Sequence, residues 1–192
     1  KIVGFGFNLI TNIKKKDIFK KLKYNFIFNY LKLYPNNQGK VAQSGWHSQI
    51  EDVKTDTFVE WIFSGATIYK KDALKSFRFN EDLGTYSYLE DLFFSYSLSK
   101  KGFKLLISKD AKFLNINVVE RSNFSFGVKE ILNRYKFVKK FNLSKKRFWI
   151  LVFFRFLKSF FGILKLNIKN FKRSFGNIYA LIIIILNIYE KK

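Results

Sequence analysis

The sequence contains no cysteine and no methionine, a single proline, a single histidine and few acidic residues. Without cysteine, the chain can form neither a disulfide framework nor a thiolate metal site. The absence of methionine at position 1 indicates that the chain begins inside a longer protein. The sequence also contains no P-loop, no GxGxxG fingerprint, no zinc-ligand pattern and no Ser-His-Asp arrangement, which excludes the enzyme classes that depend on those motifs.

Aromatic residues and positive charge are abundant instead. The 192 residues are 48% hydrophobic and include 25 Phe, which fits a chain with a real core and excludes a disordered one. Lys and Arg outnumber Asp and Glu by 9 to 1 in residues 1–40, match them at 12 each in 41–130, and exceed them by 15 to 1 in 131–192. This distribution predicts a conventional globular centre with basic flanks that meet an anionic partner.

Strand-like and helix-like patterns alternate through the first two thirds of the chain. KIVGFGFNLI (1–10) is typical of an apolar strand, and residues 14–34 have helical spacing. LEDLFFSYSLSKKG (89–102) predicts a helix that Gly102 ends, and FKLLIS (103–108) predicts a strand, with another in 110–119. Because the alternation continues from residue 41 to residue 118, we expect an α/β fold.

Beyond residue 125 the pattern becomes wholly helical. In 148–173, basic residues recur every three or four positions on an apolar helix, which is typical of a helix lying in a membrane interface. Spanning is disfavoured, because Arg155 and Lys158 fall near the middle of 148–166 and the apolar run 178–186 is short. Core helices remain an alternative. The residues predicted to contact the membrane are Arg155, Lys158, Lys165, Lys169, Lys172, Phe156 and Phe160.

Glu90 and Asp91 form an acidic pair at the predicted start of a helix, among Tyr86, Tyr88 and neighbouring phenylalanines. A carboxylate at a helix N-terminus is stabilised by roughly 0.3–1 kcal/mol, so the pair could be purely structural. However, partial burial and a neighbouring acid raise a carboxyl pKa while a helix N-terminus lowers it. Such opposed effects suit a general base.

The stretch from Trp61 to Asn115 resembles the acceptor-side half of a family 2 glycosyltransferase of GT-A fold. The shared features, in order, are Ser64-Gly65, Lys70, Phe79-Asn80-Glu81, Glu90-Asp91, Gly102 and Asp110-Ala111. Three positions depart from the family's usual residues: Phe93 and Ser97 replace an Asp and an Arg that members often have, and Asn115 replaces a His.

The resemblance implies an inverting enzyme that transfers a hexose or deoxyhexose from a nucleotide sugar to a cell-surface glycan or a lipid-linked acceptor. It implies that Asp91 is the catalytic base, with Glu90 beside it. The substrate-binding residues that we expect are Trp61, Ser64, Gly65, Ala66 and Tyr86. The family uses a divalent metal, Mg or Mn, but its Asp-rich ligand motif lies outside this chain, so we expect the isolated fragment to be inactive.

The predicted fold is therefore α/β: a partial GT-A core with a Rossmann-like mixed sheet, followed by an all-helical, basic, amphipathic C-terminal tail. Residues 1–124 are the expected acceptor-side half, and 125–192 the expected membrane-interface tail, placed peripherally on the cytoplasmic face of the cell membrane. A role in polysaccharide biosynthesis for the cell envelope follows from the resemblance. The alternatives are a basic nucleic-acid-binding module and a catalytically degenerate scaffold of the same fold.

Overall fold

The computed structural model describes residues 1–10, 28, 30–83, 87–114, 121–163 and 168–186. The chain forms two compact units. We call Lys1–Ala42 with Trp46–Asn117 the sheet unit, and Gln43–Gly45 with Val118–Lys192 the helical unit. The described elements are β1 (Ile2–Leu9), β2 (Thr57–Val59), η1 (Ser64–Ala66), β3 (Thr67–Tyr69), α3 (Lys71–Ser76), η2 (Glu81–Leu83), α4 (Glu90–Lys100), β4 (Lys104–Phe113), α5 (Phe124–Lys140), α6 (Lys145–Ile163) and α7 (Ile168–Ile185).

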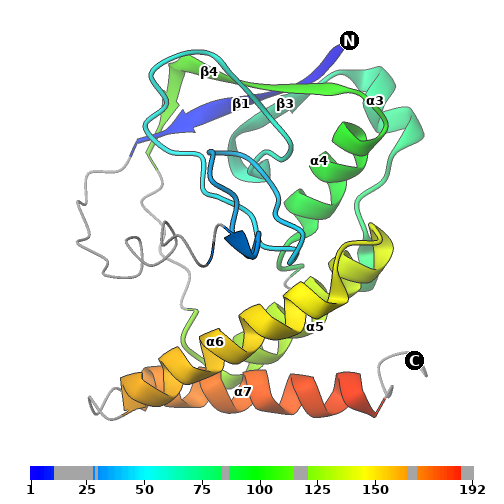
Figure 1. The fold of residues 1–192 in the computed structure, drawn as a ribbon. Helices are drawn as coiled ribbons and strands as arrows, with labels where there is room; N and C mark the ends of the chain where they lie inside the picture. Colours follow the sequence, from blue (N-terminus) through cyan, green and yellow to red (C-terminus); the bar gives the residue numbers. More distant parts are fainter. Residues whose placement is uncertain (11–27, 29, 84–86, 115–120, 164–167, 187–192) are drawn as a thin grey trace. The chain divides into compact units, whose positions relative to one another are not determined.

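The sheet unit contains a four-stranded mixed sheet in the order β2-β4-β1-β3 (Figure 1). β1 runs parallel to β4 and antiparallel to β3, and β2 is antiparallel to β4. The predicted α/β class is confirmed by this sheet and its helices. The sequence predicted two strands between 103 and 119, but a single strand, β4, occupies 104–113.

β1 can lie at the centre of this sheet because glycine alternates along it. A Cβ on Gly6 would lie 2.3 Å from Ile62 and 2.4 Å from Ile107, and one on Gly4 would lie 2.8 Å from Leu105 and 2.9 Å from Tyr69. Neighbouring side chains therefore cross the strand at both positions. α4 packs near β4 and contributes Leu92, Phe93, Phe94 and Leu98 to the core.

α4 ends where the sequence predicts. Gly102 has a φ of +85°, which a residue with a Cβ adopts only with strain, and the Gly102 amide donates to the Ser99 carbonyl at 3.0 Å. The chain can then turn back and enter β4 at Lys104.

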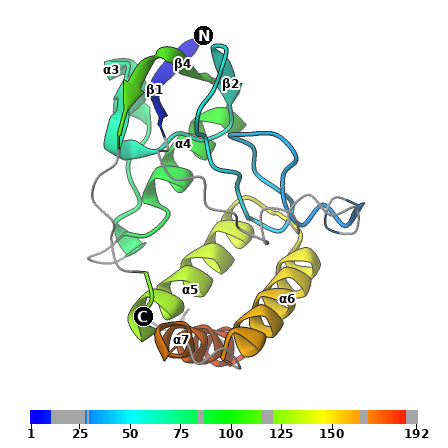
Figure 2. The same ribbon diagram turned by 90° about the vertical axis from the view of Figure 1, so that its left-hand side faces the viewer.

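The helical unit consists of α5, α6 and α7 with a short loop from earlier in the sequence (Figure 2). Asn123 caps α5 by accepting a hydrogen bond from the Phe126 amide at 2.7 Å. The Gln43–Gly45 loop joins this unit: the Ser144 amide donates to the Gln43 carbonyl at 2.9 Å, and Arg134 donates to the Gly45 carbonyl at 2.8 Å.

α7 packs mainly against α5 and also contacts α6. The periodicity of 148–173 predicts one continuous helix, but the structure contains two, α6 ending at Ile163 and α7 beginning at Ile168. The helix predicted over 14–34 lies mostly outside the described residues. Within the described part of the chain, no helix is both long enough and apolar enough to cross a membrane.

Candidate active site at the start of helix α4

α4 begins at Glu90, so the predicted position of the acidic pair at a helix start is confirmed. The residue before it, Leu89, is buried and has a φ of +78°. A non-glycine residue in this left-handed region costs about 1–2 kcal/mol. Backbone strain of this kind occurs preferentially at functional sites, so the strained Leu89 draws attention to the two carboxylates that follow it.

Hydrogen bonds fix the first turn of α4. The Glu90 amide donates to the Ser87 carbonyl at 2.8 Å, the Phe93 amide to the Leu89 carbonyl at 2.9 Å, and the Leu92 amide to Asp91 Oδ1 at 2.8 Å. The side chains of Glu90 and Asp91 are both half-buried. The helix therefore holds Asp91 in place while the residue stays partly exposed.

Ser95 ties this turn to the predicted substrate-binding segment. Its hydroxyl donates to the Asp91 carbonyl at 2.5 Å and accepts from the Ile62 amide at 3.1 Å. Ile62 lies two residues before η1, the Ser64–Ala66 turn. The buried Ser95 thus connects the base candidate to the segment that the sequence assigns to sugar binding.

Tyr69 is the residue that sequence reasoning missed. Its ring lies over Gly4 and packs edge-on against Phe94, with ring centres 4.9 Å apart. Its hydroxyl is buried and has no hydrogen-bond partner among the residues that the structure describes. Burial raises the pKa of this hydroxyl above its ordinary value of 10.0, and the negative charge of Asp91 raises it further. The signal available in the sequence was the Gly-x-Gly spacing in β1, which indicates that large side chains cross that strand.

The predicted substrate-binding residues differ in their accessibility. Ser64 and Ala66 are half-buried and Gly65 is exposed, so the η1 turn can be approached from solvent. Tyr86 lies outside the described residues.

Trp61 requires a correction. It was expected to offer a flat ring to a sugar, but the residue is only 4% exposed. Its indole Nε1 donates to the Ser48 carbonyl at 3.0 Å, and its ring packs edge-on against His47 with centres 4.3 Å apart. Because neighbouring residues surround it, Trp61 belongs to the core of the sheet unit.

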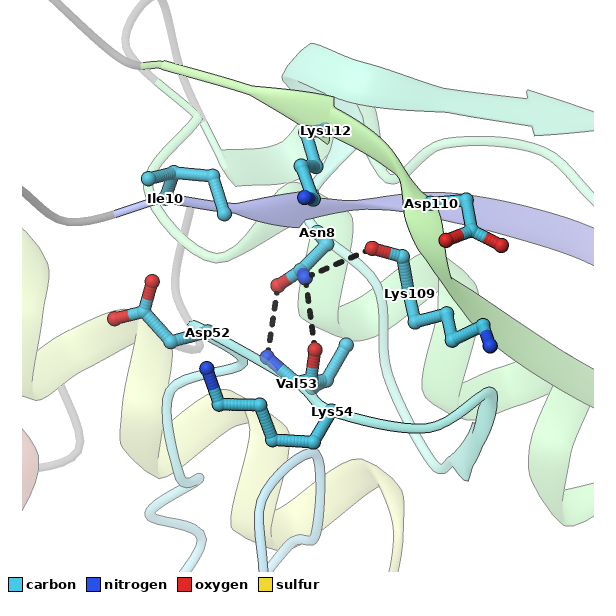
Figure 3. Close-up of a pocket in the computed structure, with 8 residues that line it drawn as sticks. All are labelled: Asn8, Ile10, Asp52, Val53, Lys54, Lys109, Asp110 and Lys112. Atoms are coloured by element: carbon cyan, nitrogen blue, oxygen red, sulfur yellow. Dashed lines mark hydrogen bonds between the residues drawn. The ribbon is translucent and has the colours of Figure 1, made fainter.

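A cavity of about 210 Å³ lies beside the ends of β1 and β4 (Figure 3). Buried Asn8 organises it by donating to the Val53 carbonyl at 3.0 Å and to the Lys109 carbonyl at 3.3 Å, and by accepting from the Val53 amide at 2.9 Å. The residues that line it are Asn8, Ile10, Asp52, Val53, Lys54, Lys109, Asp110 and Lys112. Three lysines and two aspartates nearly balance in charge, and none of the predicted catalytic residues lines this cavity.

The described residues do not fit the divalent metal that the family resemblance implies. Within that part of the chain, no group of three or more His, Asp or Glu side chains converges in a way that could hold a metal ion. No catalytic step is therefore assigned to a metal here.

The residues predicted to contact a membrane have different environments. Arg155 Nη2 forms an ion pair with Glu130 Oε1 at 2.6 Å, so a carboxylate inside the helical unit neutralises the charge of Arg155. Phe156 is half-buried and Lys172 is exposed. The side chains of Lys158, Phe160 and Lys169, and all of Lys165, lie outside the described part of the structure.

Comparison with known proteins does not add a relative: no family model matches the chain, and neither the curated proteins nor the solved structures include a significant match.

Proposed function

We propose that this chain is the acceptor-side part of an inverting glycosyltransferase in which Asp91 is the general base. The donor is a nucleotide sugar, and the acceptor is a hydroxyl of a cell-surface glycan or of a lipid-linked sugar. The proposal extends the family resemblance of residues 61–115, and the geometry at the start of α4 supports it.

The observation that carries the proposal is the setting of Asp91. The carboxylate is half-buried, held by the Leu92 amide, and placed directly after the strained Leu89. It also lies close enough to the buried Tyr69 hydroxyl for its charge to raise the pKa of that group. A positioned, partly desolvated carboxylate is the kind of group that accepts a proton during a reaction.

In the proposed reaction, the acceptor hydroxyl oxygen attacks the anomeric carbon of the donor. The new glycosidic bond forms as the bond to the nucleoside diphosphate breaks, and the proton of the hydroxyl passes to Asp91. A single displacement inverts the configuration at that carbon and forms no covalent sugar–enzyme intermediate, unlike the retaining hydrolases. The Ser64–Ala66 turn is accessible and could place backbone groups beside the sugars.

The test is Asp91→Asn in the full-length protein that contains this chain. Nucleoside diphosphate release is measured with a panel of nucleotide sugars and with a lipid and glycan extract as acceptor. Because the amide cannot take the proton, transfer should fall by about 10²–10⁴-fold or more. Donor binding and the circular dichroism spectrum should change little, since the substitution is nearly isosteric.

Two matched controls locate the effect. Glu90→Gln removes the neighbouring charge and should reduce transfer less than Asp91→Asn. Asp72→Asn removes an exposed carboxylate in the first turn of α3 and should leave transfer near the wild-type rate. If the Asp91→Asn protein transfers sugar at a near wild-type rate, Asp91 is not the general base and only stabilises the helix start.

A further inference from the structure

α7 distributes its side chains in the opposite way from an ordinary helix of a water-soluble protein. The residues that it buries are mostly small or polar: Ser174, Gly176, Asn177 and Ala180, followed by Ile184. The residues that it exposes are mostly large and apolar: Phe171, Phe175, Tyr179, Ile182 and Ile185, and the exposed Leu186 follows directly after the helix. A helix in water normally buries its large apolar face.

Close backbone contact explains the small residues on the inner face. A Cβ on Gly176 would lie 2.1 Å from the Phe124 carbonyl oxygen of α5, and one on Gly127 would lie 2.2 Å from the Arg173 carbonyl oxygen of α7. The two helices therefore meet backbone to backbone. Small residues that allow such approach are typical of helix pairs whose outer faces meet lipid.

The outer face of α7 is a continuous strip. Phe171, Phe175 and Tyr179 follow at intervals of four, and Ile182 and Leu186 extend the same side by three and four more positions. Phe175 is 49% exposed and Leu186 is 60% exposed. Phe171 and Phe175 pack together with ring centres 4.5 Å apart, and Tyr179 lies 5.7 Å from the ring of Phe124. We call Phe171, Phe175, Tyr179, Ile182 and Leu186 the α7 strip.

The charge around this strip is positive. Residues 118–192 contain 17 Lys and Arg against 3 Asp and Glu. Lys172 is exposed beside Phe171, whereas Arg173 pairs with buried Glu130 at 2.7 Å and is already neutralised. Exposed lysine next to exposed aromatic residues is the combination that binds the headgroup region of an anionic bilayer.

We propose that the α7 strip docks in the plane of an anionic lipid surface, with its aromatic rings at the headgroup boundary and Lys172 among the headgroups. A second copy of the chain fits the strip less well, because two such cationic units would repel each other. The contact differs from the one that the sequence predicts, since it lies on α7 and does not use Arg155. It concerns the helical unit and does not depend on the role of Asp91.

The experiment is vesicle co-sedimentation of the whole chain, residues 1–192, with phosphatidylglycerol-containing vesicles and with pure phosphatidylcholine vesicles. The combined Phe175→Ser and Tyr179→Ser variant should lower partitioning to anionic vesicles about tenfold or more, because two aromatic rings no longer leave water. Ile68→Ser, which alters a side chain of the sheet unit that is 61% exposed, is the control and should partition as wild type.

Varying the salt concentration and the lipid charge separates the electrostatic contribution to vesicle binding from the apolar one. Between about 0.1 M and about 1 M salt the Debye length falls from ~10 to ~3 Å, so binding should weaken but persist through the apolar strip. Lys172→Glu should weaken binding to anionic vesicles, and Lys146→Glu, at the exposed start of α6, should weaken it less. Vesicle partitioning that is unchanged by the substitutions in the α7 strip would overturn the proposal.

Because the chain lacks cysteine, one introduced thiol can report directly on the strip. A nitroxide on Phe175→Cys should become accessible to oxygen and protected from an aqueous nickel complex when vesicles are added, whereas one on Lys146→Cys should not. An unchanged label at position 175 would overturn the proposal. Two other results would also overturn the proposal. One is a wild-type chain that dimerises while the combined Phe175→Ser and Tyr179→Ser variant does not, and the other is a chain that binds single-stranded nucleic acid but not vesicles.

Discussion

The sheet unit and the helical unit differ in where they place charged side chains. Among the described residues, the charged side chains that are fully buried, Glu130 and Arg134, both belong to the helical unit. The carboxylates of the sheet unit whose burial is described are half-buried or exposed, whereas both units bury aromatic rings, such as Phe93 and Phe137. The difference teaches that one unit follows the usual rule for a domain in water, while the other is organised around an internal ion cluster.

Glu130 is the centre of that cluster. It extends from α5, accepts from Arg155 of α6 at 2.6 Å, and accepts from Arg173 of α7 at 2.7 and 3.1 Å. One carboxylate therefore links all three helices of the unit. In the sheet unit, backbone pairing connects the four strands instead.

The largest expected effect is the loss of this link. Glu130→Ala leaves two arginines without their carboxylate and should destabilise the helical unit by about 3 kcal/mol, at the lower end for a broken buried pair because both arginines are partly exposed. Hydrogen exchange should accelerate in α5, α6 and α7 and remain unchanged in β1 and β4. Glu81→Ala, an exposed carboxylate of the sheet unit, is the control. Equal acceleration in both units would contradict the comparison.

Acid should act on the same link. Burial alone would raise the pKa of Glu130, but the charges of Arg155 and Arg173, with a hydrogen bond from Arg173 and the charge of Arg134, lower it below its ordinary value of 4.5. A lowered pKa means that the stabilisation is complete above pH 4.5 and is lost as the pH falls through the lowered value. Glu130→Gln should flatten this acid dependence in chemical denaturation followed at several pH values, and Glu81→Gln should not.

A smaller effect is expected at the α5–α7 contact. Gly176→Ala forces a methyl group against the Phe124 carbonyl, which should cost about 1–3 kcal/mol by separating the helices. Gly102→Ala in the sheet unit is the matched control: nothing lies within 4 Å of its added Cβ, so its cost of about 1 kcal/mol is backbone strain alone. Thermal unfolding measures both, and a Gly176→Ala protein as stable as wild type would disprove the close contact.

The smallest effect is expected at Tyr69. Tyr69→Phe removes a buried hydroxyl that has no hydrogen-bond partner in the described part of the chain, so the free energy of unfolding at neutral pH should change by less than about 1 kcal/mol. Since the fold raises the pKa of Tyr69, the contribution of its neutral hydroxyl to the wild-type free energy of unfolding is complete below pH 10. That contribution declines as the pH rises above 10. Tyr69→Phe should weaken this alkaline decline in denaturation curves. A decline in the Tyr69→Phe protein identical to that of the wild type would mean that the fold does not shield Tyr69.

Local signals in the sequence predicted the local structure well. The acidic pair predicted the start of α4, and Gly102 predicted its end. The alternation of strand-like and helix-like patterns predicted the α/β class. These predictions succeed because helix starts and ends depend on backbone groups within one turn of the residue concerned.

Contacts between distant residues could not be predicted in this way. The family resemblance assigned Trp61 to sugar binding, yet Ser48 and His47 enclose its ring. Arg155 belongs to a basic periodicity, yet its partner Glu130 lies 25 residues earlier. Periodicity shows which residues share a face and not what covers that face, so tertiary packing decided both positions.

The parallel pairing of β1 with β4 also has a consequence during synthesis. Gly4 lies opposite Leu105, and Gly6 lies opposite Ile107, so the two strands are separated by roughly a hundred residues of chain. At a translation rate of about 5–20 residues per second, β1 must wait roughly 5–20 s before its partner emerges from the ribosome. β3 is synthesised earlier and can pair with one edge of β1, but the edge that pairs with β4 stays open during that interval, and closing so long a loop makes the pairing slow. The centre of the sheet is therefore completed only after β4 has been synthesised.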